Sequence, residues 1–537
     1  MSNSKHRPII VAIHSKLLIK KHAIIIRGLC LIKIIGNRRL DRKTLSLRAV
    51  INNKSYPVVL KWRHGISTVK GYHLNHLSIT IPLGDVLNAD IQNKITIKNI
   101  ANGDVKSGRI LFSLTDGLHG HFRHSRLCLH QNMAIYLRQS IANTMYLTVR
   151  PSNYLDLRRG SLLIFLAKVA SLVTPPKDII LLFEKECRQY QESAAVLYEK
   201  LRHDGYSQAY YVIDKTAPDF SSIPTDILDN VINKHSFKHL YYFFKCRKFI
   251  GTETIGHSIQ LRCANRLIVK KEKRSNLQYV FLQHGVMYMI SLNSNLRGGF
   301  RAENNPYKIY RIVVSSKNEA EHFTRLGGCN DNNLYITGLP KFDKAYANPD
   351  ADKIIIMPTW RRWEANQAAA NYEHTGYYQF VNRIVSAVPI SLTNKVIILP
   401  HPLMADALRA NGQYAKYLPP SNLSYDQILR HCRLLITDYS SIAYDAFYRG
   451  ANVIFDWAEK DCCLEQYGKE AFLLLNQQNA FGDIVYDEGE KLTNLISKQY
   501  KNNQSALHLK RYCQIVAFHD NHNTERLISL LRKDDVI

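Results

Sequence analysis

From residue 178 onward, short apolar runs alternate with longer amphipathic stretches, and this alternation limits the possible folds more than any other feature of the chain. Short, mainly apolar runs are typical of parallel strands that are covered on both faces. The first series is DIILLF (178–183), QAYYVID (208–214), CRKFIGT (246–252), YVFLQ (279–283), RIVVS (311–315) and NLYIT (333–337). The second is KIIIM (353–357), KVIIL (395–399), RLLIT (433–437) and NVIFD (452–456). Stretches between the runs, such as 192–206, read as helices, so the sequence predicts an α/β chain with a pair of doubly wound, Rossmann-type domains.

The first 155 residues follow a different pattern, in which short β-rich segments are separated by polar turns. Examples are AIIIRGLCLIKII, LSLRAVI, YPVVLKW and HLSITIPL. Regular short strands of this kind predict a β-rich, sandwich-like N-terminal domain. With a further boundary at the polar segment AYANPDAD (345–352), the 537 residues divide into four expected parts. These are an accessory domain (1–155), a linker or interfacial helix (156–176), a first Rossmann-like domain on the acceptor side (177–348) and a second on the donor side (349–537).

The segment LLIFLAKVASLV (162–173) is the most apolar stretch of the chain, although Lys168 interrupts it and prolines follow it. It is too short to span a bilayer. Two interpretations remain open: a buried or linking helix, and a helix that lies in a membrane interface. The N-terminal apolar run is too short for a signal peptide, so secretion is not expected.

Charge and cysteine usage restrict the partners and the compartment. Lys and Arg total 72 against 44 Asp and Glu, a net charge of +28, which favours anionic partners such as nucleic acid, an acidic membrane or a phosphate-rich polymer. The 10 cysteines show no CxxC or zinc-finger spacing, which indicates a reduced, cytosolic protein. A histidine group, His119, His121, His124 and His130, reads as a surface loop more readily than as a metal site, and no cofactor is expected.

Polar residues follow the apolar runs at the positions where parallel strands present their ligands. They are His284 and Gly285 after 279–283, Thr359, Arg361 and Arg362 after 353–357, His401 after 395–399, and Asp438, Ser440 and Ser441 after 433–437. Ser440 or Ser441 is expected to cap the helix 442–449. Two interpretations of this helix start remain open: the serines only cap the helix, or the free backbone N–H groups there bind an anion. The two imidazoles offer proton transfer, and the arginines offer bidentate contacts to phosphate.

Together these motifs resemble the CDP-glycerol glycerophosphotransferase family, which includes teichoic-acid polyol-phosphate polymerases and related capsule polymerases. The resemblance covers about residue 177 to the C-terminus. FLQHG (281–285) is similar to the family's histidine-glycine motif, MPTWR (357–361) to PTWR, LPHP (399–402) to the HP motif, and LLITDYSSIAYD (434–445) to its most diagnostic stretch. TGLPKFD (337–343) is similar to TGYPR-D, with Lys341 in place of the arginine.

The resemblance implies a GT-B fold and transfer of a polyol phosphate from CDP-glycerol or CDP-ribitol to a hydroxyl acceptor, with release of CMP. It implies His284 as the general base that deprotonates the acceptor hydroxyl, and His401 as the group that stabilises the pyrophosphate or the leaving group. Arg361, Ser440 and Ser441 then hold the donor phosphates, while Thr359 and Asp438 shape the pocket. The expected acceptor is an anionic polymer or a lipid-linked chain at the inner face of the cell membrane, guided by Lys341, Arg297, Arg301 and the basic stretch 270–274.

Two other functions remain open on the sequence. A GT-B glycosyltransferase that uses a nucleotide sugar shares the architecture, but the HG, PTWR and DYSS motifs argue against it. A basic, non-enzymatic polyanion-binding protein fits the charge, yet no nucleic-acid-binding module is recognisable, so nucleic acid is not an expected partner.

Overall fold

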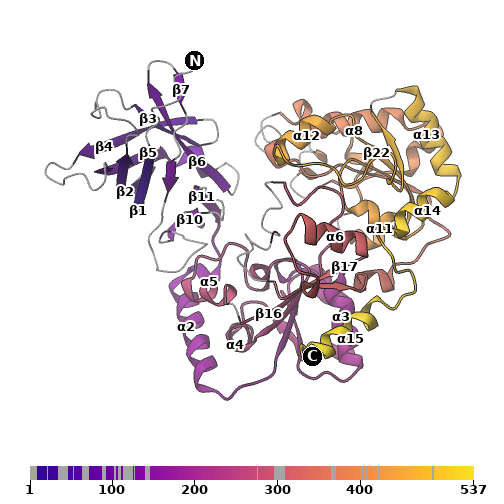
Figure 1. Ribbon diagram of the computed structural model, residues 1–537, viewed down its shortest axis with the longest axis horizontal. Helices are drawn as coiled ribbons and strands as arrows, with labels where there is room; N and C mark the ends of the chain where they lie inside the picture. The colour runs from indigo at the N-terminus through magenta and orange to yellow at the C-terminus, as the bar shows by residue number, and fades with distance from the viewer. Residues whose placement is uncertain are drawn as a thin grey trace. The chain divides into compact units, whose positions relative to one another are not determined.

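The chain forms two compact units, Met1–Leu162 and Leu163–Ile537. The computed structural model (Figure 1) describes residues 9–20, 22–33, 46–51, 54–62, 72–87, 92–101, 104–106, 110–112, 125, 127–139, 145–274, 276–294, 301, 309–364, 371–400, 404–405, 408–409, 412–420, 423–486 and 489–537.

The first unit is built on one sheet, in which the described residues form 11 strands in the order β8-β1-β2-β5-β4-β3-β6-β11-β10-β9, with β7 paired to β6. The strands are β1 (Ile9–Lys20), β2 (Ala23–Lys33), β3 (Leu47–Ile51), β4 (Lys54–Trp62), β5 (Tyr72–Pro82), β6 (Gln92–Ala101), β7 (Asp104–Lys106), β8 (Ile110–Phe112), β9 (Cys128–His130), β10 (Met133–Gln139) and β11 (Met145–Pro151). The pairs are antiparallel except β1 with β8.

The β-rich character of this unit is confirmed, whereas the hydrogen bonds join one continuous sheet instead of the two facing sheets of a sandwich. The reason lies in β6, which pairs with β3 along its second half and with β11 along its first half. A strand shared in this way fuses two sets of strands edge to edge. Alternate residues such as Ile79 and Ile81 on β5 are fully buried, so one face of the sheet forms the core.

The second unit contains two parallel sheets. The first has the order β14-β13-β12-β15-β16-β17-β18, and the second has the order β20-β19-β21-β22-β23. The strands of the first are β12 (Ile180–Phe183), β13 (Ala209–Ile213), β14 (Val231–Asn233), β15 (Lys248–Gly251), β16 (Gln278–Phe281), β17 (Arg311–Val314) and β18 (Leu334–Ile336). Those of the second are β19 (Lys353–Met357), β20 (Val396–Ile398), β21 (Cys432–Thr437), β22 (Asn452–Asp456) and β23 (Asp483–Val485).

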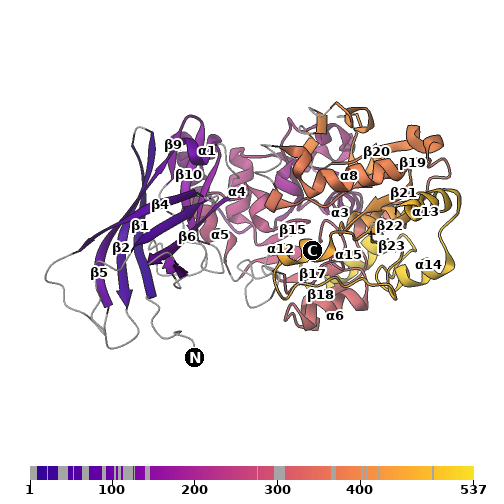
Figure 2. The ribbon, with the colours of Figure 1, turned by 90° about the horizontal axis from the view of Figure 1, so that it is seen from above.

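Helices cover both faces of the sheets, as the uninterrupted apolar runs require. In the second sheet, Ile354 and Ile356 pack with α8 (Gly376–Ala387) and α13 (Glu490–Lys501), while Ile355 faces the core that contains α11 (Ile442–Tyr448). Figure 2 shows α8 alongside β19 to β22. The other principal helices are α3 (Ser193–His203), α4 (Phe237–Lys245), α5 (Arg266–Glu272), α6 (Lys317–Arg325), α10 (Tyr425–Leu429), α12 (Lys460–Tyr467), α14 (Ala506–Cys513) and α15 (Asn523–Lys533).

The final helix, α15, returns from the second sheet to the first. There it packs beside α3 (Figure 1). The carboxylate of Asp343 accepts the backbone N–H groups of Asn523 and Thr524 at 2.9 and 2.7 Å, so it caps the start of α15. At the other end, Arg311 donates to Asp534 at 2.7 Å. We call residues 177–348 with α15 the first lobe, and residues 349–516 the second lobe.

The apolar segment 162–173 lies in α2 (Arg158–Val173). Ile164 and Ala167 are fully buried, and side chains on the opposite side of the helix are exposed. Of the helices that the structure describes, none combines the length and the apolar character needed to cross a bilayer.

Candidate active site

The loop after β16 carries His284 at the carboxyl edge of the first sheet. Gln283 precedes it with a φ of 60°, a left-handed backbone conformation that is uncommon for a non-glycine residue and is often found at functional sites. The Gln283 side chain is fully buried, and its amide donates to the carbonyl of Val313 at 2.5 Å. This sharp turn ends the strand and leaves the His284 side chain 55% exposed.

Glu253 lies next to the imidazole and is a residue that the sequence analysis missed. Its Oε1 is 3.8 Å from His284 Nδ1. Loss of solvation on burial raises the pKa of Glu253 to about 7, with Lys185 acting in the opposite direction. Glu253 follows β15, the strand beside β16, so the same strand-end rule that selected His284 would have selected it.

Hydrogen bonds from both lobes and one close approach hold the segment 285–291 between the lobes. Within the first lobe, Glu319 accepts the backbone N–H groups of Met287 and Ser315 at 2.7 and 2.6 Å. From the second lobe, the Tyr444 hydroxyl donates to the carbonyl of Tyr288 at 2.6 Å, and the Leu474 N–H donates to that of Met289 at 2.9 Å.

The close approach involves Gly285, the residue after His284. A Cβ atom built on Gly285 lies 2.9 Å from Ser441 Oγ, so a side chain at this position would collide with the serine. The structure therefore brings the His284 loop directly against the DYSS segment (438–441) of the second lobe.

Lys341 links the same two elements. Its ammonium lies 2.6 Å from Asp445 Oδ1 on α11 and donates to the His284 carbonyl at 2.7 Å. The side chains of Lys341 and Asp445 are 10% and 8% exposed. This buried bridge favours a role in positioning His284 over the predicted contact with an acceptor.

Asp438 joins the ends of β19 and β21, the neighbouring strands at which the order of the second sheet reverses. It is 1% exposed, and its Oδ1 accepts the N–H of Thr359 at 2.8 Å and the hydroxyl of Thr359 at 2.5 Å. The N–H of Tyr439 donates to the same oxygen at 2.6 Å. Thr359 and Asp438 are thus brought together, at the kind of switch point where open parallel sheets bind ligands.

Arg361 is buried among carboxylates. Its Nη2 lies 2.6 Å from Glu459 Oε2 and 3.7 Å from Asp438 Oδ2, and its Nη1 lies 3.6 Å from Glu364 Oε1. Burial opposes the guanidinium charge, but Asp438 and Glu459 outweigh it, and the pKa of Arg361 is raised. Contact between Arg361 and donor phosphates remains a prediction, and a phosphate there would compete with Glu459 for the guanidinium.

The two serines divide their roles at the start of α11. Ser441 occupies the N-cap position without a capping bond from its side chain to any described residue. Ser440 Oγ instead accepts the N–H of Ile442 at 3.4 Å. The cap predicted for one of these serines is therefore supplied, weakly, by Ser440, and the Ser441 hydroxyl faces Gly285.

Several predicted groups cannot be placed in this arrangement. His401 and Arg297 lie outside the described residues, as do His119, His121 and His124 of the histidine group. Arg301 is described and is partly buried, between two stretches that are not. In the described part of the chain, no group of three or more His, Cys, Asp or Glu side chains is arranged to hold a metal ion.

The basic stretch 270–274 does not lie near His284. Lys271 and Arg274 line a cavity with Gln278, the first residue of β16, whereas His284 follows the carboxyl end of that strand. This placement gives no support to the prediction that the stretch guides an acceptor to His284, which stays a prediction. A segment that is next to a strand in the sequence can pack at either end of that strand.

Comparison with known proteins connects this site to a family. A family model described as CDP-Glycerol:Poly(glycerophosphate) glycerophosphotransferase matches residues 166–533. The minor teichoic acid biosynthesis protein GgaB of Bacillus subtilis (strain 168) is 22% identical over 372 residues, which cover 62% of this chain and only 37% of GgaB. The chain thus spans little more than a third of that relative.

A solved structure of the wall teichoic acid polymerase TagF has a similar fold. The TM-score is 0.50 at 16% sequence identity, with 70% of this chain and 94% of the TagF chain covered. The family match itself includes both parallel sheets, the His284 loop and the DYSS segment. Since it extends over more than half of the sequence, the chain belongs to the CDP-glycerol:poly(glycerophosphate) glycerophosphotransferase family.

Proposed function

We propose that the protein transfers a polyol phosphate, glycerol phosphate or ribitol phosphate, from a CDP-alcohol to a hydroxyl of a polymer or lipid-linked acceptor, with release of CMP. The proposal includes a role in teichoic-acid or capsule-type polymer synthesis and a peripheral position at the inner face of the cell membrane. The observation that carries it is the approach of Gly285 to Ser441, which puts an exposed imidazole beside the family's most diagnostic segment.

In the proposed reaction, the His284 imidazole takes the proton of the acceptor hydroxyl. The acceptor oxygen forms a new bond to the β-phosphorus of the donor as the bond from that phosphorus to the bridging oxygen breaks. The electron pair of the broken bond leaves with CMP, and the proton remains on the imidazole until solvent removes it. Because such transfers need positioning and charge stabilisation more than covalent catalysis, the Lys341 bridge and the Thr359–Asp438 junction matter through the geometry that they impose.

Donor choice tests the proposal. The purified chain is incubated with CDP-glycerol, CDP-ribitol and a UDP-hexose, and the products are analysed by mass spectrometry. We expect CMP and a phosphodiester product from a CDP-alcohol. Release of UDP from the UDP-hexose would identify a glycosyltransferase instead, and polyanion binding without any turnover would identify a binding protein.

The ionisation of Glu253 predicts a pH dependence. Since its raised pKa is about 7, Glu253 is mainly neutral below pH 7 and anionic above it. The anion stabilises the imidazolium that forms when His284 accepts a proton, so kcat/KM is expected to rise as the pH passes 7. Glu253→Gln removes this contribution and lowers kcat/KM at pH 8 by about tenfold or more. A pH profile of the variant identical to that of the wild type would exclude the coupling.

A further inference from the structure

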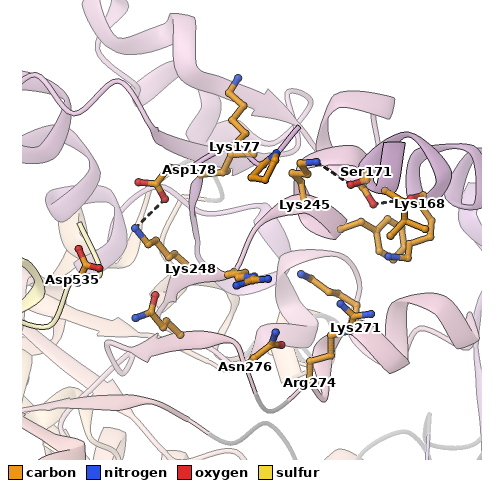
Figure 3. A pocket seen from close by; sticks show the side chains of 16 residues that line it. Lys168, Ser171, Lys177, Asp178, Lys245, Lys248, Lys271, Arg274, Asn276 and Asp535 are labelled. Carbon is orange, nitrogen blue, oxygen red and sulfur yellow. Dashed lines mark hydrogen bonds and ion pairs between the residues drawn. The ribbon is translucent and has the colours of Figure 1, made fainter. Parts of the chain in front are cut away.

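A basic cavity of about 650 Å³ (Figure 3) is lined by residues at the amino ends of β12, β15 and β16. This is the edge of the first sheet opposite to the one that His284 follows. Seven Lys or Arg residues and two Asp residues line it. One of the aspartates, Asp178, is already paired with Lys248 at 2.9 Å. The cavity therefore has a large excess of positive charge.

Three of these cations repel one another: Lys168 on α2, Lys271 on α5 and Arg274 just after α5. Lys271 is 4% exposed, and burial followed by the charges of Arg274 and Lys168 lowers its pKa to about 8. Burial, Arg274 and Lys270 likewise lower the pKa of Lys168. A bound anion would relieve this repulsion, and phosphate is an anion that lysine and arginine bind readily.

An apolar surface adjoins the cavity. We call the exposed side of α2 the α2 ridge; it consists of Phe165, Leu166, Val169, Leu172 and Val173. Leu172 and Val173 are 68% and 77% exposed, and Leu172 also lines the cavity. The end of α2 is fixed to the first lobe, because Lys245 donates to the carbonyl of Ser171 at 3.0 Å and to that of Thr174.

We propose that the α2 ridge and the basic cavity together form a docking surface for an anionic lipid bilayer. The ridge enters the boundary between headgroups and acyl chains, and the cavity holds the phosphate of a lipid headgroup. An apolar helix face flanked by cations has the chemistry of an interfacial anchor, and the excess of lysine and arginine complements an anionic leaflet. This inference deepens the membrane-peripheral position proposed above and uses none of the residues of the candidate active site.

Vesicle binding by the full chain tests the proposal. Cosedimentation is measured with vesicles of phosphatidylcholine alone and of phosphatidylcholine with phosphatidylglycerol. We expect binding to the anionic vesicles only, weakened by salt. The double variant Lys168→Gln/Arg274→Gln should bind them roughly 20-fold more weakly, since each cation near such a surface contributes to the attraction. The matched control, Lys498→Gln/Lys501→Gln on α13, loses the same charge from two exposed positions and should bind nearly as the wild type does.

A second variant tests the ridge, and further measurements separate the sources of phosphate. Leu172→Gln/Val173→Gln keeps every charge and should also weaken vesicle binding. Inorganic phosphate at millimolar concentration should not release the wild type from the vesicles. Equal binding to neutral vesicles, equal losses in the control variant, or release by free phosphate would overturn the proposal. CMP release with a soluble acceptor is expected to be unchanged in all these variants, so failure of the docking surface is distinct from failure of the transfer reaction.

Discussion

His284→Ala is expected to slow the release of CMP from a CDP-alcohol by about 10²–10⁴-fold, the usual contribution of a general base. The fold should survive, because the side chain is 55% exposed and substitutions at such positions usually change stability by about 0.5 kcal/mol or less. The measurement is CMP release under saturating donor, together with the melting temperature.

The chain offers a matched control for this variant in His203. Its side chain is 54% exposed and lies 3.0 Å from the carboxylate of Asp226, so it resembles His284 in exposure and in having an acidic neighbour. It is the last residue of α3, whose other end, at Ser193, is the one that approaches Lys341. His203→Ala should therefore retain wild-type turnover. An unchanged rate in His284→Ala, or an equal loss in both variants, would remove His284 from the role of base.

Lys341→Met is expected to destabilise the protein by about 3–5 kcal/mol, because it removes the close partner of the buried Asp445 carboxylate and leaves only Arg449, at 4.0 Å. It also removes the donor to the His284 carbonyl, so the protein that remains folded should turn over more slowly. Calorimetry and CMP release at a temperature below the transition measure the two effects separately. Lys341→Arg should preserve both, since arginine keeps the charge and stands at this place in the related motif.

Two further variants separate charge burial from positioning. In Lys341→Met/Asp445→Leu both members of the buried pair are replaced, so stability should largely return while turnover stays low. Lys344→Met is the control, because Lys344 is 52% exposed and pairs with Glu199 at the surface, where an ion pair contributes little. Full recovery of turnover in the double variant would contradict a positioning role for Lys341.

The sequence predicted the strands well, because a strand covered on both faces has to be apolar throughout. Each of the ten predicted runs overlaps a strand of the two parallel sheets. The missed strands, β14 and β23, each contain only two adjacent aliphatic residues, whereas the equally short edge strands β18 and β20 lie within longer apolar runs. The pairing of β6 with both β3 and β11 could not be predicted from the sequence either. Alternation of apolar residues shows which face of a strand is buried, but it does not show which strand lies next to it.

Site residues that directly follow a strand could be predicted from the sequence. Residues that tertiary packing brings to the site could not. The strand-end rule selected His284, Thr359 and Asp438, and applied more widely it would also have selected Glu253. It could not reveal that Lys341 lies beneath the His284 loop, because 57 residues separate the two in the chain. Nor could it reveal the carboxylates around Arg361, which come from three separate segments.

The return of α15 to the first lobe has a consequence for synthesis on the ribosome. Asp343 and Arg311 emerge early, but the segment that satisfies them, 523–534, is translated last. Domains that are contiguous in the chain can fold in the order in which they are made. Here the earlier lobe stays incomplete until the later one has been translated, so nascent chains stalled before residue 523 should leave the α3 side of that lobe accessible to chaperones.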